Sequence, residues 1–326
     1  MATKKKSGAS LQRLATIARP NRMGQVAGST LYLLETKVSD DFLPAFPDAT
    51  VARIVAWDVT NPEAPERKGS CDVRAAWSFV ATRQALYVLL ARKIDEKRSV
   101  MDLAVLDLSE PLAPKLATTL EDVGTFGSDS KQPVLVVGHN HLVLSTRVAA
   151  SVEVFDLLAP LAPKKVATVA LSDTPQAAFG DERGVLVTFL GNDTPMVELT
   201  GSGATWDVRR IAGLGGSELP ARLGETIFRA TGDHHNELGL FDRDGKQRSA
   251  TKLGPTSIAV RVDGEHVVTL GDALSVFSAD GTLIAKKKGP ESPMFSASGG
   301  FVLLPQRADA KAEKSKAFAF ELWKLS

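Results

Sequence analysis

Short apolar runs alternate with turn residues along the whole chain, and this pattern predicts strands rather than helices. In seven places two such runs flank a small, usually Gly-containing turn, which is typical of a β-hairpin. No segment shows a long 3.6-residue periodicity, so we expect almost no helix. The predicted hairpins are Val26–Leu34, Val80–Leu90, Val136–Ser145, Ala178–Phe189, Arg222–Ala230, Arg261–Leu270 and Ser296–Leu304.

A third strand is expected after each hairpin, and a more polar fourth strand after six of them. The third strands should end near Asp58, Asp107, Asp156, Glu198, Asp242, Ser278 and Glu321. The fourth strands should cover Glu66–Val73, Lys115–Leu120, Lys164–Ala170, Thr205–Ala212, Gln247–Leu253 and Leu283–Lys287. Units of four antiparallel strands with a period of about 40–50 residues indicate a β-propeller. We therefore predict an all-β fold with seven blades.

The seventh unit lacks a fourth strand, because the chain ends soon after the expected third strand at Ala317–Leu325. Leu11–Ala18 resembles the fourth strands, for example Lys165–Val169, and it precedes the first hairpin. We expect this N-terminal strand to complete the last blade, which would remove open sheet edges. Residues 1–9 are expected to form a disordered basic tail, and residues 10–326 a single propeller domain.

Three stretches repeat more closely than the rest: Ile54–Pro65, Leu103–Pro114 and Val152–Pro163. Each is an apolar run that ends in Asp, with Pro four residues later and a second Pro three residues after that. The Asp residues are separated by equal steps of 49 residues. An Asp at a strand end can accept a hydrogen bond from the backbone ahead and start a turn, and Pro stops strand pairing. We interpret Asp58, Asp107 and Asp156 as structural turn residues.

These stretches resemble the LVIVD repeat of bacterial β-propeller proteins, well over roughly residues 22–171 and by pattern alone from there to the end. The resemblance implies the propeller fold, but no activity, because the family has no single one to transfer. Many proteins with this repeat look secreted or attached to a surface. Here the N-terminus MATKKKSGAS lacks the apolar core of a secretory signal, so we expect a bacterial-type cytoplasmic protein.

Composition and charge narrow the classes of partner. Apolar residues make up 44% of the chain and charged residues 24%, as in ordinary globular proteins. The net charge of +1 creates no field that favours nucleic acid or an anionic membrane, and no apolar run approaches the roughly 18 residues of a membrane span. The single cysteine, Cys71, excludes an intramolecular disulfide and a Cys-rich zinc site. We expect neither a nucleic-acid nor a membrane partner.

Residue patterns for catalysis or metal binding are weak. His139, His141 and His266 are expected in turns on one face, and His234 and His235 on the other, whereas zinc needs three or four convergent ligands. We interpret all five as turn and surface histidines. The run from Asp242 to Gly245 has part of a calcium-loop pattern without its remaining ligands, so a hairpin turn is expected there. No catalytic residue, metal or cofactor is predicted.

The connections between the second and third strands are predicted to be long in blades 1, 2 and 7 only, at residues 36–50, 91–100 and 306–316. These blades become neighbours when the ring closes, and loops carry function more often than scaffolds do. An apolar centre with a charged rim is typical of an interaction site, although the aromatic residues could instead pack back onto blade 1. The predicted binding residues are Phe42, Leu43, Phe46, Arg92, Lys93, Lys97, Arg98, Arg307, Lys311 and Lys314.

The sequence therefore favours a non-catalytic scaffold that binds a protein or peptide through these loops. The alternative is an enzyme, a propeller-type hydrolase or lactonase with its site at the mouth of the central channel. Fold alone does not decide between them. The scaffold is favoured because no set of titratable residues is predicted to converge.

Overall fold

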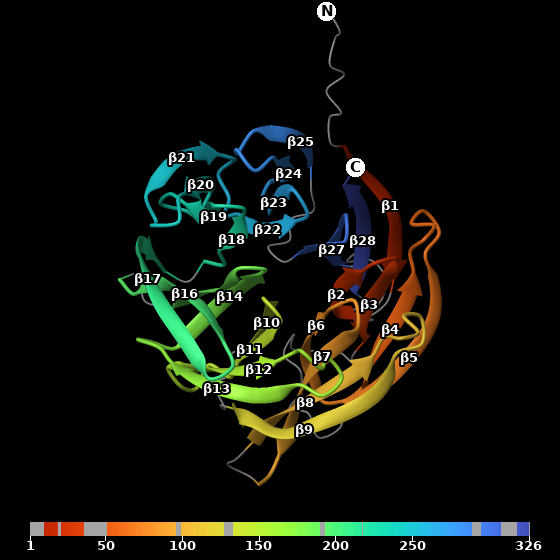
Figure 1. Ribbon diagram of the computed structural model, residues 1–326. Coiled ribbons are helices and arrows are strands. Elements are labelled where there is room, and N and C mark those ends of the chain that lie inside the picture. Colours follow the sequence, from red (N-terminus) through yellow and green to blue (C-terminus); the bar gives the residue numbers. More distant parts are fainter. Residues whose placement is uncertain are drawn as a thin grey trace, which may run out of the picture.

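The computed structural model describes residues 10–18, 21–35, 51–95, 99–126, 133–189, 193–216, 218–288, 295–307 and 318–325. In these residues, seven four-stranded antiparallel sheets stand around a central axis like the blades of a propeller (Figure 1). The described residues form no helix, and hence none that could cross a membrane. The predicted seven-bladed all-β fold is confirmed.

Each blade has its first strand near the axis and its fourth strand at the rim (Figure 1). Blade 1 contains β2 (Asn21–Ala27), β3 (Thr30–Glu35), β4 (Val51–Asp58) and β5 (Glu66–Arg74). Blade 2 contains β6 (Ala76–Ala81), β7 (Ala85–Lys93), β8 (Ser99–Asp107) and β9 (Lys115–Phe126). Blade 3 contains β10 (Val134–Gly138), β11 (His141–Ser145), β12 (Ser151–Asp156) and β13 (Lys164–Ala170).

The second half of the ring repeats this order. Blade 4 contains β14 (Pro175–Asp181), β15 (Gly184–Phe189), β16 (Pro195–Ser202) and β17 (Thr205–Gly215). Blade 5 contains β18 (Ala221–Leu223), β19 (Thr226–Thr231), β20 (Glu237–Phe241) and β21 (Gln247–Lys252). Blade 6 contains β22 (Ala259–Asp263), β23 (His266–Leu270), β24 (Ala273–Phe277) and β25 (Leu283–Lys288). Blade 7 contains β26 (Ser296–Ser298), β27 (Phe301–Arg307), β28 (Phe318–Leu325) and β1 (Leu11–Ala18).

The ring is closed by the N-terminal strand, as predicted. β1 pairs with β28 from Leu11 opposite Leu325 to Ala18 opposite Ala319, and the two strands lie side by side in Figure 1. Near the axis, the Ser298 hydroxyl accepts a hydrogen bond from the Val26 amide at 2.8 Å, which joins blade 7 to blade 1. The two ends of the described chain thus build one blade between them, and that blade is bonded to the next one.

The two faces of the ring carry different connections. We call the first the turn face, because it holds the turns between first and second strands and the connections between third and fourth strands. The Val59 amide, for example, donates to the Ser29 carbonyl there. The second, the crossover face, holds the connections between second and third strands and the links from blade to blade. On this face the Ile258 amide donates to the His235 carbonyl.

The repeated Asp residues start their turns through local hydrogen bonds on the turn face. The Oδ1 atoms of Asp58, Asp107 and Asp156 each accept a hydrogen bond from the backbone amide two residues ahead, at 2.9, 2.7 and 2.8 Å. The first proline of the repeat also joins neighbouring blades. The Tyr32 hydroxyl donates to the Pro111 carbonyl at 3.0 Å, and the Tyr87 hydroxyl donates to the Pro160 carbonyl at 3.1 Å.

The core lies between successive blades, where the apolar faces of neighbouring sheets meet. Tyr32 and Tyr87 are almost fully buried there, at 1% and 0% exposure. Blades also approach one another closely through glycine, as between the inner strands of blades 3 and 4, where Gly180 packs against Val137. A Cβ atom on Gly180 would lie 2.2 Å from the Val137 carbonyl oxygen. Only glycine fits this approach, which sets the spacing of the two blades.

Blade 2 differs from the prediction in its strand lengths. β7 and β8 extend into the range expected as a loop, with Ala91 opposite Met101 and Lys93 opposite Ser99. The connection between them is residues 94–98, no longer than residues 146–150 in blade 3. The expected long loop at 91–100 is therefore wrong. Asp102 on β8 accounts for the longer strands. It is only 6% exposed, binds Arg92 on β7, and accepts a hydrogen bond from the Asp122 amide on β9 at 2.8 Å.

Candidate functional site

Most of the predicted binding residues lie outside the described residues. These are Phe42, Leu43, Phe46, Lys97, Arg98, Lys311 and Lys314. Lys93 and Arg307 are the last residues of β7 and β27, and their side chains also lie outside the described part. The prediction that these side chains form a binding surface stays a prediction.

Arg92 is the one predicted binding residue with a described side chain. Its Nε and Nη2 atoms donate to the two carboxylate oxygens of Asp102 at 2.6 and 3.0 Å. Nη2 also lies 3.6 Å from Glu121 Oε2. Such a two-point contact fixes the plane of the guanidinium. Arg92 therefore links β7, β8 and β9 within blade 2, and 40% of its side chain stays exposed.

The five histidines lie where the sequence places them, but one of them is not on the surface. His141 is only 5% exposed and packs edge-on against Trp206, with ring centroids 4.9 Å apart. Its Nδ1 atom lies 2.7 Å from the His139 carbonyl oxygen. The interpretation of His141 as a surface histidine is therefore wrong, because Trp206 of blade 4 covers it. Within the described residues, no three His, Cys, Asp or Glu side chains are grouped to hold a metal ion.

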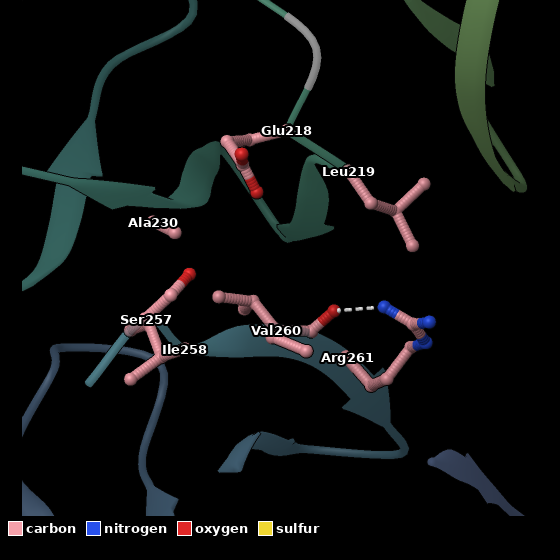
Figure 2. Close-up of a pocket in the computed structure, with 8 residues that line it drawn as sticks. Glu218, Leu219, Ala230, Ser257, Ile258, Val260 and Arg261 are labelled. Carbon is pink, nitrogen blue, oxygen red and sulfur yellow. Dashed lines mark hydrogen bonds between the residues drawn. The ribbon is translucent and has the colours of Figure 1, made fainter. Parts of the chain in front are cut away.

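A cavity of about 210 Å³ lies at the inner end of blades 5 and 6, on the crossover face. Its walls come from the link into blade 5, the link into blade 6, and the inner strand β22 (Figure 2). These backbone segments converge because two successive blades start here. The lining residues are Glu218, Leu219, Ala230, Ser257, Ile258, Ala259, Val260 and Arg261.

The cavity has charged groups of opposite sign on different walls (Figure 2). Arg261 Nη1 donates to the Val260 carbonyl at 2.8 Å, and the guanidinium carbon lies 5.3 Å from the centre of the Phe295 ring. Burial lowers the pKa of Arg261 to about 10. Glu218 lies across the cavity, and its Oε1 atom is 3.7 Å from His235 Nδ1. This distance exceeds that of a normal hydrogen bond, so the Glu218 carboxylate retains free bonding capacity.

A second arginine adds positive charge beside the cavity. Arg229 precedes the lining residue Ala230 on β19 and is only 8% exposed. Its Nε atom has no hydrogen-bond partner among the described residues. Burial lowers the pKa of Arg229, and the negative charge of Glu218 acts in the opposite direction. Buried charges without full compensation are costly, so this end of the ring can gain free energy by binding an anionic group.

Sequence reasoning missed this cavity. Its residues lie in two blade-to-blade links and one inner strand, and Glu218 and Arg261 are far apart in the chain. No spacing or motif joins them. The only sequence signal is an arginine in the otherwise apolar stretch Ile258–Val262, which an alternating strand pattern also explains.

Between blades 4 and 5 the charged groups neutralise one another. Arg222 pairs with Asp181, with Nη2 and Oδ1 2.5 Å apart, and also with Glu198. Arg209 pairs with the other oxygen of Glu198 at 2.8 Å. Burial alone would raise the pKa of Glu198, but the hydrogen bonds and charges of the two arginines lower it. This network connects the two blades and has no uncompensated buried charge comparable to that beside the cavity.

Comparisons with known proteins support the fold and do not give a family. No family model matches the chain, and no curated protein matches it. Among solved structures, the computationally designed Ika8 protein is similar, with a TM-score of 0.55, 9% identity, and coverage of 96% of this chain and 99% of the other. Hsv2 from Kluyveromyces lactis is also similar, with a TM-score of 0.51, 12% identity, and coverage of 80% and 74%. At these identities the similarity concerns the β-propeller fold alone.

Proposed function

We propose that this β-propeller is a non-catalytic binding scaffold for a protein or peptide partner, which binds on the crossover face at blades 7, 1 and 2. The β-propeller fold is compatible with such a role, but folds of this kind host many functions. The proposal therefore depends on local features of this chain.

The unequal length of the connections between second and third strands carries the proposal. Residues 36–50 separate β3 from β4, and residues 308–317 separate β27 from β28. The corresponding connections of blades 2 to 6 contain five residues or fewer. Blades 7 and 1 are neighbours, because the ring closes through β1 and β28. Two long insertions therefore start from adjacent blades on one face, and loops carry function more often than scaffolds do.

The residue types in these insertions suit a protein partner. The blade 1 segment contains Phe42, Leu43 and Phe46, and the blade 7 segment contains Lys311 and Lys314. Aromatic residues surrounded by a rim of charged residues are typical anchors of protein interfaces. From blade 2, Lys97 and Arg98 belong to the short connection at 94–98, which starts next to the oriented guanidinium of Arg92.

The state of four buried or half-buried acidic groups also supports a non-catalytic role. Glu198 and Asp181 are held by Arg222, and Asp102 is held by Arg92. Asp263 accepts a hydrogen bond from the Gly300 amide at 2.7 Å, in the turn of the next blade. A general acid or base needs a free proton-transfer position facing a substrate. These carboxylates have structural partners instead.

The test is affinity capture from an extract of the cells that make the protein, followed by affinity measurement with the purified partner. Replacing Phe42 and Phe46 together by alanine should weaken binding by about 2 kcal/mol or more, the usual threshold of a hot spot. Replacing Lys97 and Arg98 by glutamate should mainly slow association and change its salt dependence.

The matched control is Leu158→Ala, since Leu158 is 82% exposed and lies in the Asp–Pro connection on the turn face. This variant should bind the partner like the unaltered protein. If Leu158→Ala weakens binding while the double phenylalanine variant does not, the partner binds the turn face and the proposed surface is wrong.

A further inference from the structure

We propose that the cavity between blades 5 and 6 binds a small zwitterion with an aliphatic body: a free aliphatic amino acid or a short aliphatic peptide. In this arrangement Arg261 would bind the ligand carboxylate, and Glu218 would bind its ammonium group. The site is independent of the partner surface proposed above, because it is built by other blades.

The positive side of the cavity is suited to a carboxylate. A guanidinium has five N–H donors, and the contacts of Arg261 are the Val260 carbonyl and the face of the Phe295 ring. Arg261 forms no ion pair with a carboxylate in the described part of the chain, unlike Arg222 one blade earlier. The pKa of Arg261 is lowered because burial removes the guanidinium from water. An anion in the cavity would stabilise the charged guanidinium in place of that water.

The negative side is suited to an ammonium group. The side chain of Glu218 is 28% exposed, and its carboxylate points into the cavity from the wall opposite β22 (Figure 2). Ser257 lies on a third wall and adds a hydroxyl group (Figure 2). A purely anionic ligand would meet the Glu218 carboxylate, and a purely cationic ligand would meet Arg261 and the neighbouring Arg229. A ligand with both charges satisfies both walls.

The size and lining of the cavity limit the rest of the ligand. Its volume of about 210 Å³ is below the roughly 300–1,000 Å³ of sites for drug-sized molecules. Leu219, Ala230 and Ile258 give it an apolar wall, and Ile258 is only 4% exposed. Among the described residues, the wall has no aromatic side chain to stack a flat ring. A short aliphatic group therefore fits between the two charged ends.

The test is a calorimetric titration of the full chain with L-leucine and with L-leucyl-L-leucine, which separate the free amino acid from the peptide. At least one of them should bind with a Kd of about 1 mM or lower. Leucinamide lacks the carboxylate and N-acetyl-leucine lacks the ammonium group. Each should bind at least about tenfold more weakly than leucine, since each loses a charge-assisted contact. If only the dipeptide binds, the corresponding dipeptides with a blocked carboxylate or a blocked ammonium group are compared with it instead.

Variants assign the two charges to their residues. Arg261→Gln should weaken the zwitterion about tenfold or more and leave the amide unaffected, because the amide no longer has the group that Arg261 binds. Glu218→Gln should also weaken the zwitterion about tenfold or more. It should leave N-acetyl-leucine unaffected, because N-acetyl-leucine lacks the ammonium group that Glu218 binds. Arg248→Gln, the same chemical change on the exposed strand β21 of blade 5, is the matched control and should bind like the unaltered protein.

Three results would overturn the proposal: neither zwitterion binds at about 10 mM, the blocked analogues bind as well as the zwitterion, or both cavity variants keep full affinity. The blocked analogues are tested on the unaltered protein, so this arm does not depend on how well a variant folds.

Discussion

The two tyrosines of the chain make the contact between blades measurable in solution. Tyr32 and Tyr87 are the only tyrosines present, and each donates its hydroxyl hydrogen to a proline carbonyl of the next blade. Burial raises the pKa of both from the ordinary value near 10 to about 12. Tyrosinate absorbance therefore reports on these two positions alone, without interference from other blades.

The pKa difference sets the sign and size of the effect. Because the folded-state pKa lies above the unfolded value, the contribution of each tyrosine to stability is fully present below about pH 10. This contribution is lost as the pH rises towards 12. At 1.36 kcal/mol per pH unit, a difference of about two units corresponds to about 2.7 kcal/mol for each tyrosine. Both together amount to about 5 kcal/mol, comparable to the total stability of many domains. Tyrosinate should therefore appear together with unfolding and not before it.

Phenylalanine variants isolate this contribution. At pH 8, the double variant Tyr32→Phe with Tyr87→Phe should be about 2 kcal/mol less stable than the unaltered protein, because each of the two substitutions removes one hydrogen bond worth about 1 kcal/mol. Phenylalanine cannot ionise, so the double variant avoids the alkaline loss. The two curves of unfolding free energy against pH should cross between about pH 10 and 11, and above that the variant should be the more stable protein.

The assay is urea unfolding at a series of pH values, with near-ultraviolet absorbance and circular dichroism recorded in parallel. Titration of both tyrosines near pH 10, with the native circular dichroism retained, would refute the reasoning, since exposed hydroxyls cannot be the buried contacts described. Curves that stay parallel over the whole range would refute it as well.

Two further predictions concern the ends and turns of the blades. Deleting residues 1–19 removes β1 and exposes the edge of β28, so the protein should lose several kcal/mol of stability or aggregate; a truncated protein with an unchanged melting temperature would exclude closure by β1. Asp107→Ala removes the hydrogen bond to the Ser109 amide and should cost about 1 kcal/mol of unfolding free energy in urea titration without changing partner affinity. A folded Asp107→Ala protein that no longer binds its partner would show that this residue acts in the site.

Local sequence was enough to predict the strands because their signals are local. The ends of β1 and β13 agree with the ranges predicted from the sequence, Leu11–Ala18 and Lys164–Ala170. The two Asp-Gly turns could also be predicted from the sequence. Gly245 and Gly281 have φ values of +85° and +82°, which favour glycine over residues with a side chain. The resemblance to the LVIVD repeat, drawn from the same local pattern, stays a prediction.

Where a charge lies inside a strand, the sequence was ambiguous. Arg92 and Asp102 stand in stretches that a sequence pattern assigns to a loop and to a buried strand, respectively. Only the pairing of β7 with β8 brings the two side chains together, and the Arg92 guanidinium compensates the buried charge of Asp102. His141 is a similar case, since the side chain that covers it, Trp206, belongs to the next blade.

The sequence by itself determined the number of blades, the order of their strands and the closure by the N-terminal segment. These follow from the alternation of apolar residues and turns, which acts over a few residues and repeats along the chain. Only the tertiary structure decided which side chains of different blades meet. Arg261 and Glu218 face one cavity, and Arg222 binds two carboxylates of blade 4, because contacts between blades depend on their spacing and rotation around the axis, which no local pattern records.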